Sequence, residues 1–350
     1  MMTQRENMLR TVRFEKPERI PMGYWINGAC WNHYPRAALD ELQESHPYLF
    51  PNFKRAAEAT TARVPAPPAR QNAMDEWGVP RMSPEEGIAS VPASHPLADW
   101  SALDRYTPPP LPDLTADEKK KPNLADENRR DAEAKGVLVH GGLPHGHTFL
   151  RLSDLRGYEN LICDMADDEP RLWRLIEIVE AHNAALVRCA LKRGAEWMGY
   201  PEDLGMQVGP MLSPAHLRKY IKPSYRRLMK PARDAGCIIH MHSDGDIRDL
   251  VDDLVDSGVQ VVNLQDLVNG IEWIRRRFKG KACIDLDIDR QSVTRFGTPA
   301  QVDELIRDEV KTLGSREGGL MMIYGMYVGI PLENAKALMD AMEKYSTHFA

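Results

Sequence analysis

From residue 136 onwards, short apolar runs alternate with amphipathic helices, and this alternation is what most restricts the fold. The apolar runs cover residues 137–140, 196–200, 237–242, 259–264, 282–286 and 320–324. The helices between them have recognisable ends, since Thr298-Pro-Ala-Gln301 is a capping box and Gly194 follows a helix over residues 170–192. Strands that alternate with helices in this way form parallel sheets.

Two further candidate strands, over residues 19–25 and near Met74, bring the number of units to eight. Eight units without a Gly-x-Gly-x-x-Gly turn favour a (β/α)8 barrel over an open doubly wound sheet. We therefore predict an α/β protein with one domain over residues 1–350. Dense prolines over residues 64–112 predict an irregular excursion across one face. Residues 1–14 predict a short helix on the body of the protein.

The composition of the chain argues against several classes of binding partner. The 350 residues carry a formal charge of -6, which gives no general attraction to nucleic acid or to an anionic membrane. Five cysteines without a Cys-x-x-Cys pair do not form a disulfide framework. Residues 1–14 lack a long apolar core, so we expect them to be neither a signal peptide nor a membrane span. We expect a soluble cytoplasmic protein that acts on a small molecule, and a homodimer is compatible with the sequence.

The strand over residues 237–242 passes directly into a polar segment that contains His242, Asp244 and Asp246. Polar side chains at the carboxyl end of a strand in an α/β protein are where chemistry usually takes place. Gly245 allows a sharp turn, and Asp246 is expected to cap the helix that follows. The alternative is that His242 is a packed core histidine and the aspartates only cap helices. For His240, the packed core histidine is the favoured interpretation.

Other strand ends are also polar, and in a barrel they would converge on one mouth. The candidates are Trp25, Asn27, His140, Glu202, Asp203, Gln207, Asn263, Asp266, Asp285, Asp287, Arg290 and Tyr324. The loop over residues 140–147 could offer two or three imidazoles to a metal, although a glycine-rich loop with incidental histidines explains it equally well. The excess of carboxylates favours a metal, a cationic group or hydroxyls as the ligand, and disfavours a polyanion.

Several segments together resemble the uroporphyrinogen decarboxylase superfamily, which also contains zinc-dependent methylcobamide methyltransferases. The segments are Leu155-Arg-Gly-Tyr-Glu-Asn-Leu-Ile-Cys-Asp-Met165, Glu202-Asp-Leu-Gly205, His242-Ser-Asp-Gly245, Asp287-Ile-Asp-Arg290 and Pro331-Leu-Glu-Asn-Ala335. The resemblance covers most of the chain and implies a (β/α)8 barrel, in agreement with the count of strands.

Two features favour the methyltransferase branch of this superfamily. The decarboxylases bind their substrate carboxylates through an Arg-Gln-Ala-Gly-Arg motif, and the corresponding residues 24–30 contain no arginine. The methyltransferases hold zinc through a His-x-Cys-Gly motif, matched here by His242-Ser-Asp244-Gly. The resemblance thus implies His242 and Asp244 as ligands of zinc or another divalent metal, and a corrinoid protein as partner. Aspartate replaces the first cysteine, and residues 324–327 offer no cysteine for the second.

The resulting hypothesis is a metal-assisted methyltransferase that acts on a small methylated substrate. The candidate catalytic residues are Asp203, Glu202, His242 and Tyr324, with Asp203 and Glu202 as acid/base groups or as a third ligand. The candidate substrate-binding residues are Trp25, Asn27, His140, Gln207, Asp266 and Asp287. The alternatives are a cofactor-independent decarboxylase, or a barrel that binds a corrinoid or a small ligand without catalysis.

Overall fold

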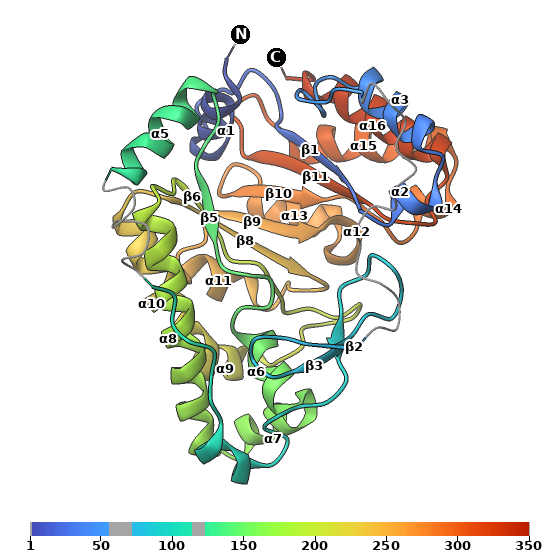
Figure 1. The fold of residues 1–350 in the computed structure, drawn as a ribbon. Helices are drawn as coiled ribbons and strands as arrows, with labels where there is room; N and C mark the ends of the chain where they lie inside the picture. Colours follow the sequence, from blue (N-terminus) through green and yellow to red (C-terminus); the bar gives the residue numbers. More distant parts are fainter. Residues whose placement is uncertain (1, 56–71, 114–122, 350) are drawn as a thin grey trace.

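The computed structural model describes residues 2–55, 72–113 and 123–349, and its centre is a curled parallel sheet (Figure 1). Its strands are β1 (Met22–Ile26), β5 (His140–Gly142), β6 (Trp197–Gly199), β7 (Glu202–Asp203), β8 (Ile238–Asp244), β9 (Val261–Gln265), β10 (Cys283–Asp287) and β11 (Leu320–Met326). They pair in the order β1-β11-β10-β9-β8-β6-β5, and the short β7 also pairs with β8. The blue β1 therefore lies beside the red β11, so the two ends of the chain meet within the sheet (Figure 1).

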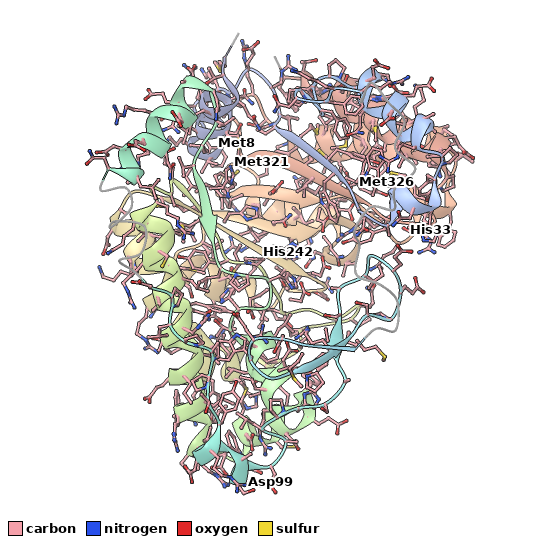
Figure 2. All side chains as sticks on the ribbon, in the orientation of Figure 1. Met8, His33, Asp99, His242, Met321 and Met326 are labelled. Atoms are coloured by element: carbon pink, nitrogen blue, oxygen red, sulfur yellow. The ribbon has the colours of Figure 1, made fainter. Side chains whose placement is uncertain are left out.

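The curl of the sheet is visible in a small apolar cluster at the amino ends of its strands. Met8 on helix α1 (Gln4–Arg13) lies in one cluster with residues from five strands and from the segment before β5. Those residues are Leu138, Trp197, Ile238, Val261, Cys283 and Met321. Figure 2 places Met8 next to Met321, on the far side of the sheet's centre from the strand ends that carry polar groups. Side chains from five strands can meet one helix only if the sheet is concave, with α1 across its amino end.

The convex face is covered by helices, as the alternating sequence predicts. Helices and helical turns are α2 (Cys30–His33), α3 (Arg36–Ser45), α5 (Leu124–Ala134), α6 (Phe149–Arg156), α7 (Tyr158–Ala166), α8 (Arg171–Lys192), α9 (Pro214–His216), η2 (Leu217–Ile221), α10 (Lys222–Asp234), α11 (Val251–Ser257), α12 (Asp266–Asn269), α13 (Ile271–Phe278), α14 (Val293–Phe296), α15 (Pro299–Leu313) and α16 (Leu332–Ser346). Outward side chains such as Ile239 and Met241 join these helices in the main core. Burying one face of each strand in this way leaves the carboxyl half of the inner face, beyond the apolar cluster of Met8, to the polar residues.

Local chemistry explains several helix ends. The Thr298 hydroxyl accepts from the backbone of Gln301, whose side chain accepts from the backbone of Thr298, so the predicted capping box is present at the start of α15. A π-helical turn, η2, separates α9 from α10, and Pro223 lies in the first turn of α10, where its missing backbone N–H removes no helix hydrogen bond.

Three expectations about the chain need correction. The segment near Met74 is not a strand of the main sheet, because β2 (Asn72–Met74) pairs antiparallel with β3 (Pro80–Met82), and β3 pairs with β4 (Val91–Pro92). The excursion therefore contains a small sheet and the turn η1 (Trp100–Arg105), while its first residues, 64–71, lie outside the described part. Asp246 does not cap α11, which begins only at Val251.

The predicted barrel is confirmed as a curled parallel α/β sheet rather than as a closed cylinder. Within the described residues, β1 and β5 are the two edges of the sheet and do not pair with each other. No described helix is long and apolar enough to cross a lipid bilayer.

Candidate metal centre

The carboxyl end of β8 carries the centre of the site because its side chains alternate between the two faces. Ile239, Met241 and Ser243 are buried towards the helices, so His240, His242 and Asp244 point to the concave side. The adjacent β7 runs in register with β8 and places Asp203 opposite Asp244. The Oδ1 atom of Asp203 accepts a hydrogen bond from the backbone of Asp244 at 3.1 Å, which fixes this carboxylate beside β8.

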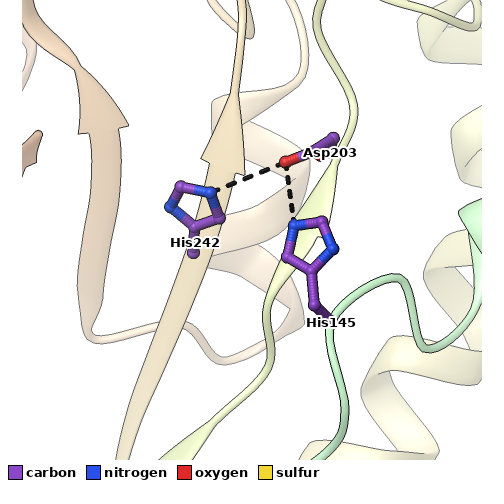
Figure 3. Close-up of side chains that lie close together, drawn as sticks. All are labelled: His145, Asp203 and His242. Carbon is purple, nitrogen blue, oxygen red and sulfur yellow. Dashed lines mark hydrogen bonds and ion pairs between the residues drawn. The ribbon is translucent and has the colours of Figure 1, made fainter. Parts of the chain in front are cut away.

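Two imidazoles from separate segments converge on the Asp203 carboxylate (Figure 3). Its Oδ1 atom lies 3.2 Å from Nε2 of His145 and 3.6 Å from Nε2 of His242. His145 comes from the loop after β5. Ligand atoms on a tetrahedral zinc ion with bonds of about 2.0–2.1 Å are separated by roughly 3.3 Å. The spacing of these two nitrogens and one oxygen therefore suits a metal with His₂Asp ligands before any ion is bound.

Asn263 holds the His242 ring in the orientation that a metal requires. The Asn263 amide nitrogen donates to the backbone oxygen of Asp285 at 2.6 Å, so its Oδ1 atom faces His242. That oxygen lies 2.5 Å from Nδ1 of His242 and can only accept, so Nδ1 carries the proton. The neutral ring then presents the unprotonated Nε2 atom to Asp203, as expected of a metal-binding histidine with an outer hydrogen-bond partner.

The pKa values in the cluster reflect burial and close charge. The hydrogen bond to Asp203 raises the pKa of His145 above its ordinary value, and burial opposes this. Burial acts against ionisation of Asp203, yet the hydrogen bond and the charge of His145 hold the pKa of that carboxyl below its usual range. Burial lowers the pKa of His242, and the charges of Asp244 and Asp203 oppose the shift. The result is an ionised carboxylate beside a neutral His242, which is the protonation state that binds a cation.

A second pair of carboxylates, those of Asp244 and Asp287, also lies close to His242. Asp244 Oδ1 is 3.5 Å from His242 Nε2, and a second set of groups spaced for a metal consists of His242, Asp244 and Asp287. Arg290 contacts both carboxylates, at 2.7 Å from Asp287 and 3.3 Å from Asp244. Arg290 already compensates the charge of the second set, so His145, Asp203 and His242 are the stronger candidate for a metal site.

The family model for uroporphyrinogen decarboxylase (URO-D) matches residues 149–345, more than half of the chain. The chain belongs to the URO-D family. No curated protein matches it. Among solved structures, a methyltransferase from Methanosarcina mazei is similar at a TM-score of 0.63, with 14% identity over 99% of both chains. A B12-independent methionine synthase from a Shewanella species gives a TM-score of 0.40, with 10% identity over 64% of this chain and 65% of that one. The first likeness shows that this chain has the fold of that protein along its whole length.

Six of the predicted site residues lie on or near the concave side. Asp203, His242 and Asp244 form the cluster described above, and Asp287 joins it through Arg290. His140 also faces inward, deeper than the cluster, with its ring 5.8 Å from that of Trp197. Trp25 lies at the end of β1, with 40% of its surface exposed, and packs edge-on against Tyr327.

Glu202 and Tyr324 do not reach the cluster. Glu202 is fully buried and accepts hydrogen bonds from the backbone of Thr148 and Phe149 and from the Tyr225 hydroxyl. Burial raises the pKa of Glu202 to about 7, and these donors oppose the shift. Tyr324 is likewise buried, and its hydroxyl lies 3.1 Å from Thr294 behind the sheet. Each is one position out of phase with the inward residues, so each faces the helices.

The remaining three predicted residues are held elsewhere. Asp266 is buried and accepts from the backbone of Leu267 and Asp289, so it supports the loop after β10. The Asn27 amide is used within the loop after β1, where it bonds Ala29 and Gly87. Gln207 is exposed in the loop after β7. All three residues follow the end of a strand, where the alternation of side chains between the two faces of the sheet no longer determines which way a side chain points.

Three residues that contribute to the site could not be given an individual role from the sequence. His145 lies in the histidine-rich loop that could have bound a metal, and the spacing of that loop did not show which histidine would converge. Asn263 and Arg290 are polar residues at strand ends whose roles depend on the register between neighbouring strands. That register pairs His242 with Asn263.

Proposed function

We propose that this URO-D family protein is a metal-dependent methyltransferase that acts on a small methylated substrate, with a corrinoid protein as its partner. The observation that carries the proposal is the convergence of His145, Asp203 and His242 at spacings that suit one metal ion. The similar fold of the Methanosarcina protein, described as a methyltransferase, supports the same class of reaction. The donor set contains no thiolate, so zinc and other borderline divalent ions fit it.

The residues of the chain have separable roles in this proposal. His145, Asp203 and His242 hold the ion, while Asn263 fixes the His242 ring. A divalent metal bound there would supply Lewis acidity, which lowers the pKa of a bound nucleophile or polarises the leaving atom of the methyl donor. Arg290 holds Asp244 and Asp287 in place beside the site. Three protein ligands leave a position for substrate, which is the arrangement of catalytic rather than structural zinc sites.

Charge argues against uroporphyrinogen as the substrate. A molecule with many carboxylates needs cationic partners. Arg290 is a basic side chain at this site, and it is already shared between two aspartates. We therefore expect no turnover of uroporphyrinogen, and a direct assay with that substrate checks this part of the proposal.

Metal titration tests the proposed centre before any substrate is known. Cobalt(II) added to metal-free protein should give the intense visible absorption of a four-coordinate site with nitrogen and oxygen ligands. The variants His145→Ala, Asp203→Asn and His242→Ala should each weaken cobalt binding by about ten-fold or more. His33→Ala is the matched control, because His33 forms an exposed pair with Glu86 at 3.0 Å, distant from His242 in Figure 2.

Methyl transfer is then measured with the zinc-loaded protein. Reduced cobalamin is supplied as the acceptor with a panel of methyl ethers, thioethers and amines, and its visible spectrum reports methylation. Transfer that requires metal and is lost in His242→Ala supports the proposal. Equal cobalt binding by all three variants and the control would refute the metal centre.

A further inference from the structure

The loop that carries His145 is attached along the segment that leads to Asp203. Two hydrogen bonds between backbone groups, of 2.9 and 3.0 Å, join this loop to the carbonyl oxygens of Gly199 and Pro201. At the end of the loop, where helix α6 begins, two further backbone N–H groups donate to the side chain of Glu202. The first two attachments join backbone to backbone, so they do not require a particular residue type. The third attachment depends on one carboxylate.

The two oxygens of the Glu202 side chain hold the start of helix α6. Oε1 accepts from the backbone N–H of Thr148, and Oε2 accepts from that of Phe149 at 2.9 Å. The first N–H groups of a helix have no partner within the helix, and the side chain of Thr148, at the N-cap position, makes no capping hydrogen bond. The Tyr225 hydroxyl also donates to Oε2, at 3.1 Å. Glu202 therefore caps α6 from a strand that lies 53 residues beyond Phe149 in the chain.

Packing alone does not explain a carboxylate at this position. Glu202 has no exposed surface, and burying a carboxylate is costly unless hydrogen bonds satisfy it. Its neighbour Asp203 faces the opposite side of the strand and lies 3.2 Å from Nε2 of His145, as Figure 3 shows. One residue of β7 thus belongs to the proposed metal centre, and the residue before it holds the loop that brings an imidazole to that centre.

We propose that Glu202 is a positioning residue for the metal centre, and that it holds His145 against Asp203 by capping the start of α6. Glutamine has nearly the same shape, but its amide group places N–H donors opposite one of the two backbone N–H groups. A buried N–H group without an acceptor is costly, so the start of α6 and the loop before it should shift to find another partner. The effect of Glu202 on metal affinity rests on the proposed function, whereas its effect on the position of His145 does not.

Nuclear magnetic resonance of the metal-free protein tests the position of His145 directly. The ring nitrogens of histidine are isotopically labelled, and the signals of His145 are those that are missing from His145→Ala. In Glu202→Gln at the same pH, these signals should move towards the values of a histidine in free solution. Tyr225→Phe is the matched control, because it removes a hydrogen bond to the same carboxylate and leaves both bonds to the start of α6. It should leave the His145 signals in place.

Cobalt titration tests the consequence for the metal centre. Glu202→Gln should weaken cobalt binding by about ten-fold, as the loss of an outer partner of a ligand does, whereas Tyr225→Phe should bind cobalt as the wild type does. In the double variant Glu202→Gln/His145→Ala, cobalt affinity should equal that of His145→Ala alone, because Glu202 acts through a ligand that is already absent. A general structural role would instead add a further loss. Glu202→Met removes both acceptors without introducing a donor, so it should behave as Glu202→Gln does and replaces that variant if it does not fold.

The two measurements separate this inference from the proposed function. Unchanged His145 signals in the Glu202 variants, an equal displacement in Tyr225→Phe, or losses of cobalt affinity that add in the double variant would overturn the role of Glu202 and leave the metal centre standing. Displaced His145 signals in a protein that binds no cobalt, or that binds it with unchanged affinity, would support the role of Glu202 in positioning and count against the metal centre.

Discussion

Replacing Asn263 by alanine tests whether the proposed metal centre depends on the orientation of His242. The change removes the oxygen 2.5 Å from Nδ1 of His242 and the amide 2.6 Å from the backbone oxygen of Asp285. The ring can then rotate or present its protonated nitrogen to the metal. Loss of such an outer partner costs about 10- to 100-fold in metal affinity, or about 1.4–2.7 kcal/mol.

The same substitution also has a structural cost that must be measured separately. The buried carbonyl of Asp285 loses its donor, which should lower the free energy of unfolding by about 1–3 kcal/mol. Zinc affinity is measured by competition with a chelator, and unfolding by denaturant titration of the metal-free protein. Asn263→Asp keeps an acceptor for Nδ1, so it should restore zinc affinity while retaining most of the loss of stability.

Gln265 provides the control on the same strand. Its side chain accepts from the backbone of Gly245 at 2.9 Å and touches no proposed ligand. Gln265→Ala should lower stability without a comparable loss of zinc affinity. If Asn263→Ala binds zinc as the wild type does, or if both alanine variants lose affinity equally, the argument that Asn263 orients His242 is wrong.

Three further predictions concern pH and backbone strain. Zinc affinity should fall as the pH drops through the raised pKa of His145, because protons compete for Nε2, and a chelator competition series against pH measures this. Burial, together with the nearby Asp266, raises the pKa of Glu309. The stabilisation that the protonated Glu309 side chain contributes is therefore complete below its unfolded-state pKa and declines as the pH rises through its folded-state pKa. Glu309→Gln should flatten the dependence of the melting temperature on pH. Gly245 has φ +80° and faces the backbone of another glycine at close range, so Gly245→Ala should cost about 3 kcal/mol or more in denaturant unfolding.

The strands with strong apolar runs were predictable from sequence, and with them the inward direction of His242. Alternation along β8 depends only on where the strand lies, and the run over residues 237–242 defines that well. The same logic gave Asp203 a place beside His242. Glu202, its neighbour in the chain, faces the opposite way, and a sequence without an exact strand register cannot decide between two adjacent carboxylates.

The predictions that were wrong or incomplete concern contacts between segments that are far apart in the sequence. The residues near Met74 have the apolar content of a strand, but their partner is β3 rather than the main sheet. Asp266 follows its strand directly, yet backbone donors from the loop after β10 draw its carboxylate away from the concave face. The convergence of His145 on Asp203 joins the loop after β5 to strand β7, 58 residues further along the chain. No local pattern records such a meeting, because the fold alone brings the two side chains together.

Helix α1 also bears on the order in which the chain can fold. It is synthesised before every strand of the sheet, yet the side chains that receive Met8 range from Leu138 to Met321. Its strand neighbour β1 pairs with β11, close to the carboxyl end. Neither element has its native partners until nearly the whole chain is available, so both should dock late and slowly, as contacts of large sequence separation do. During synthesis, the apolar face of α1 must therefore stay uncovered while the strands of the sheet are made.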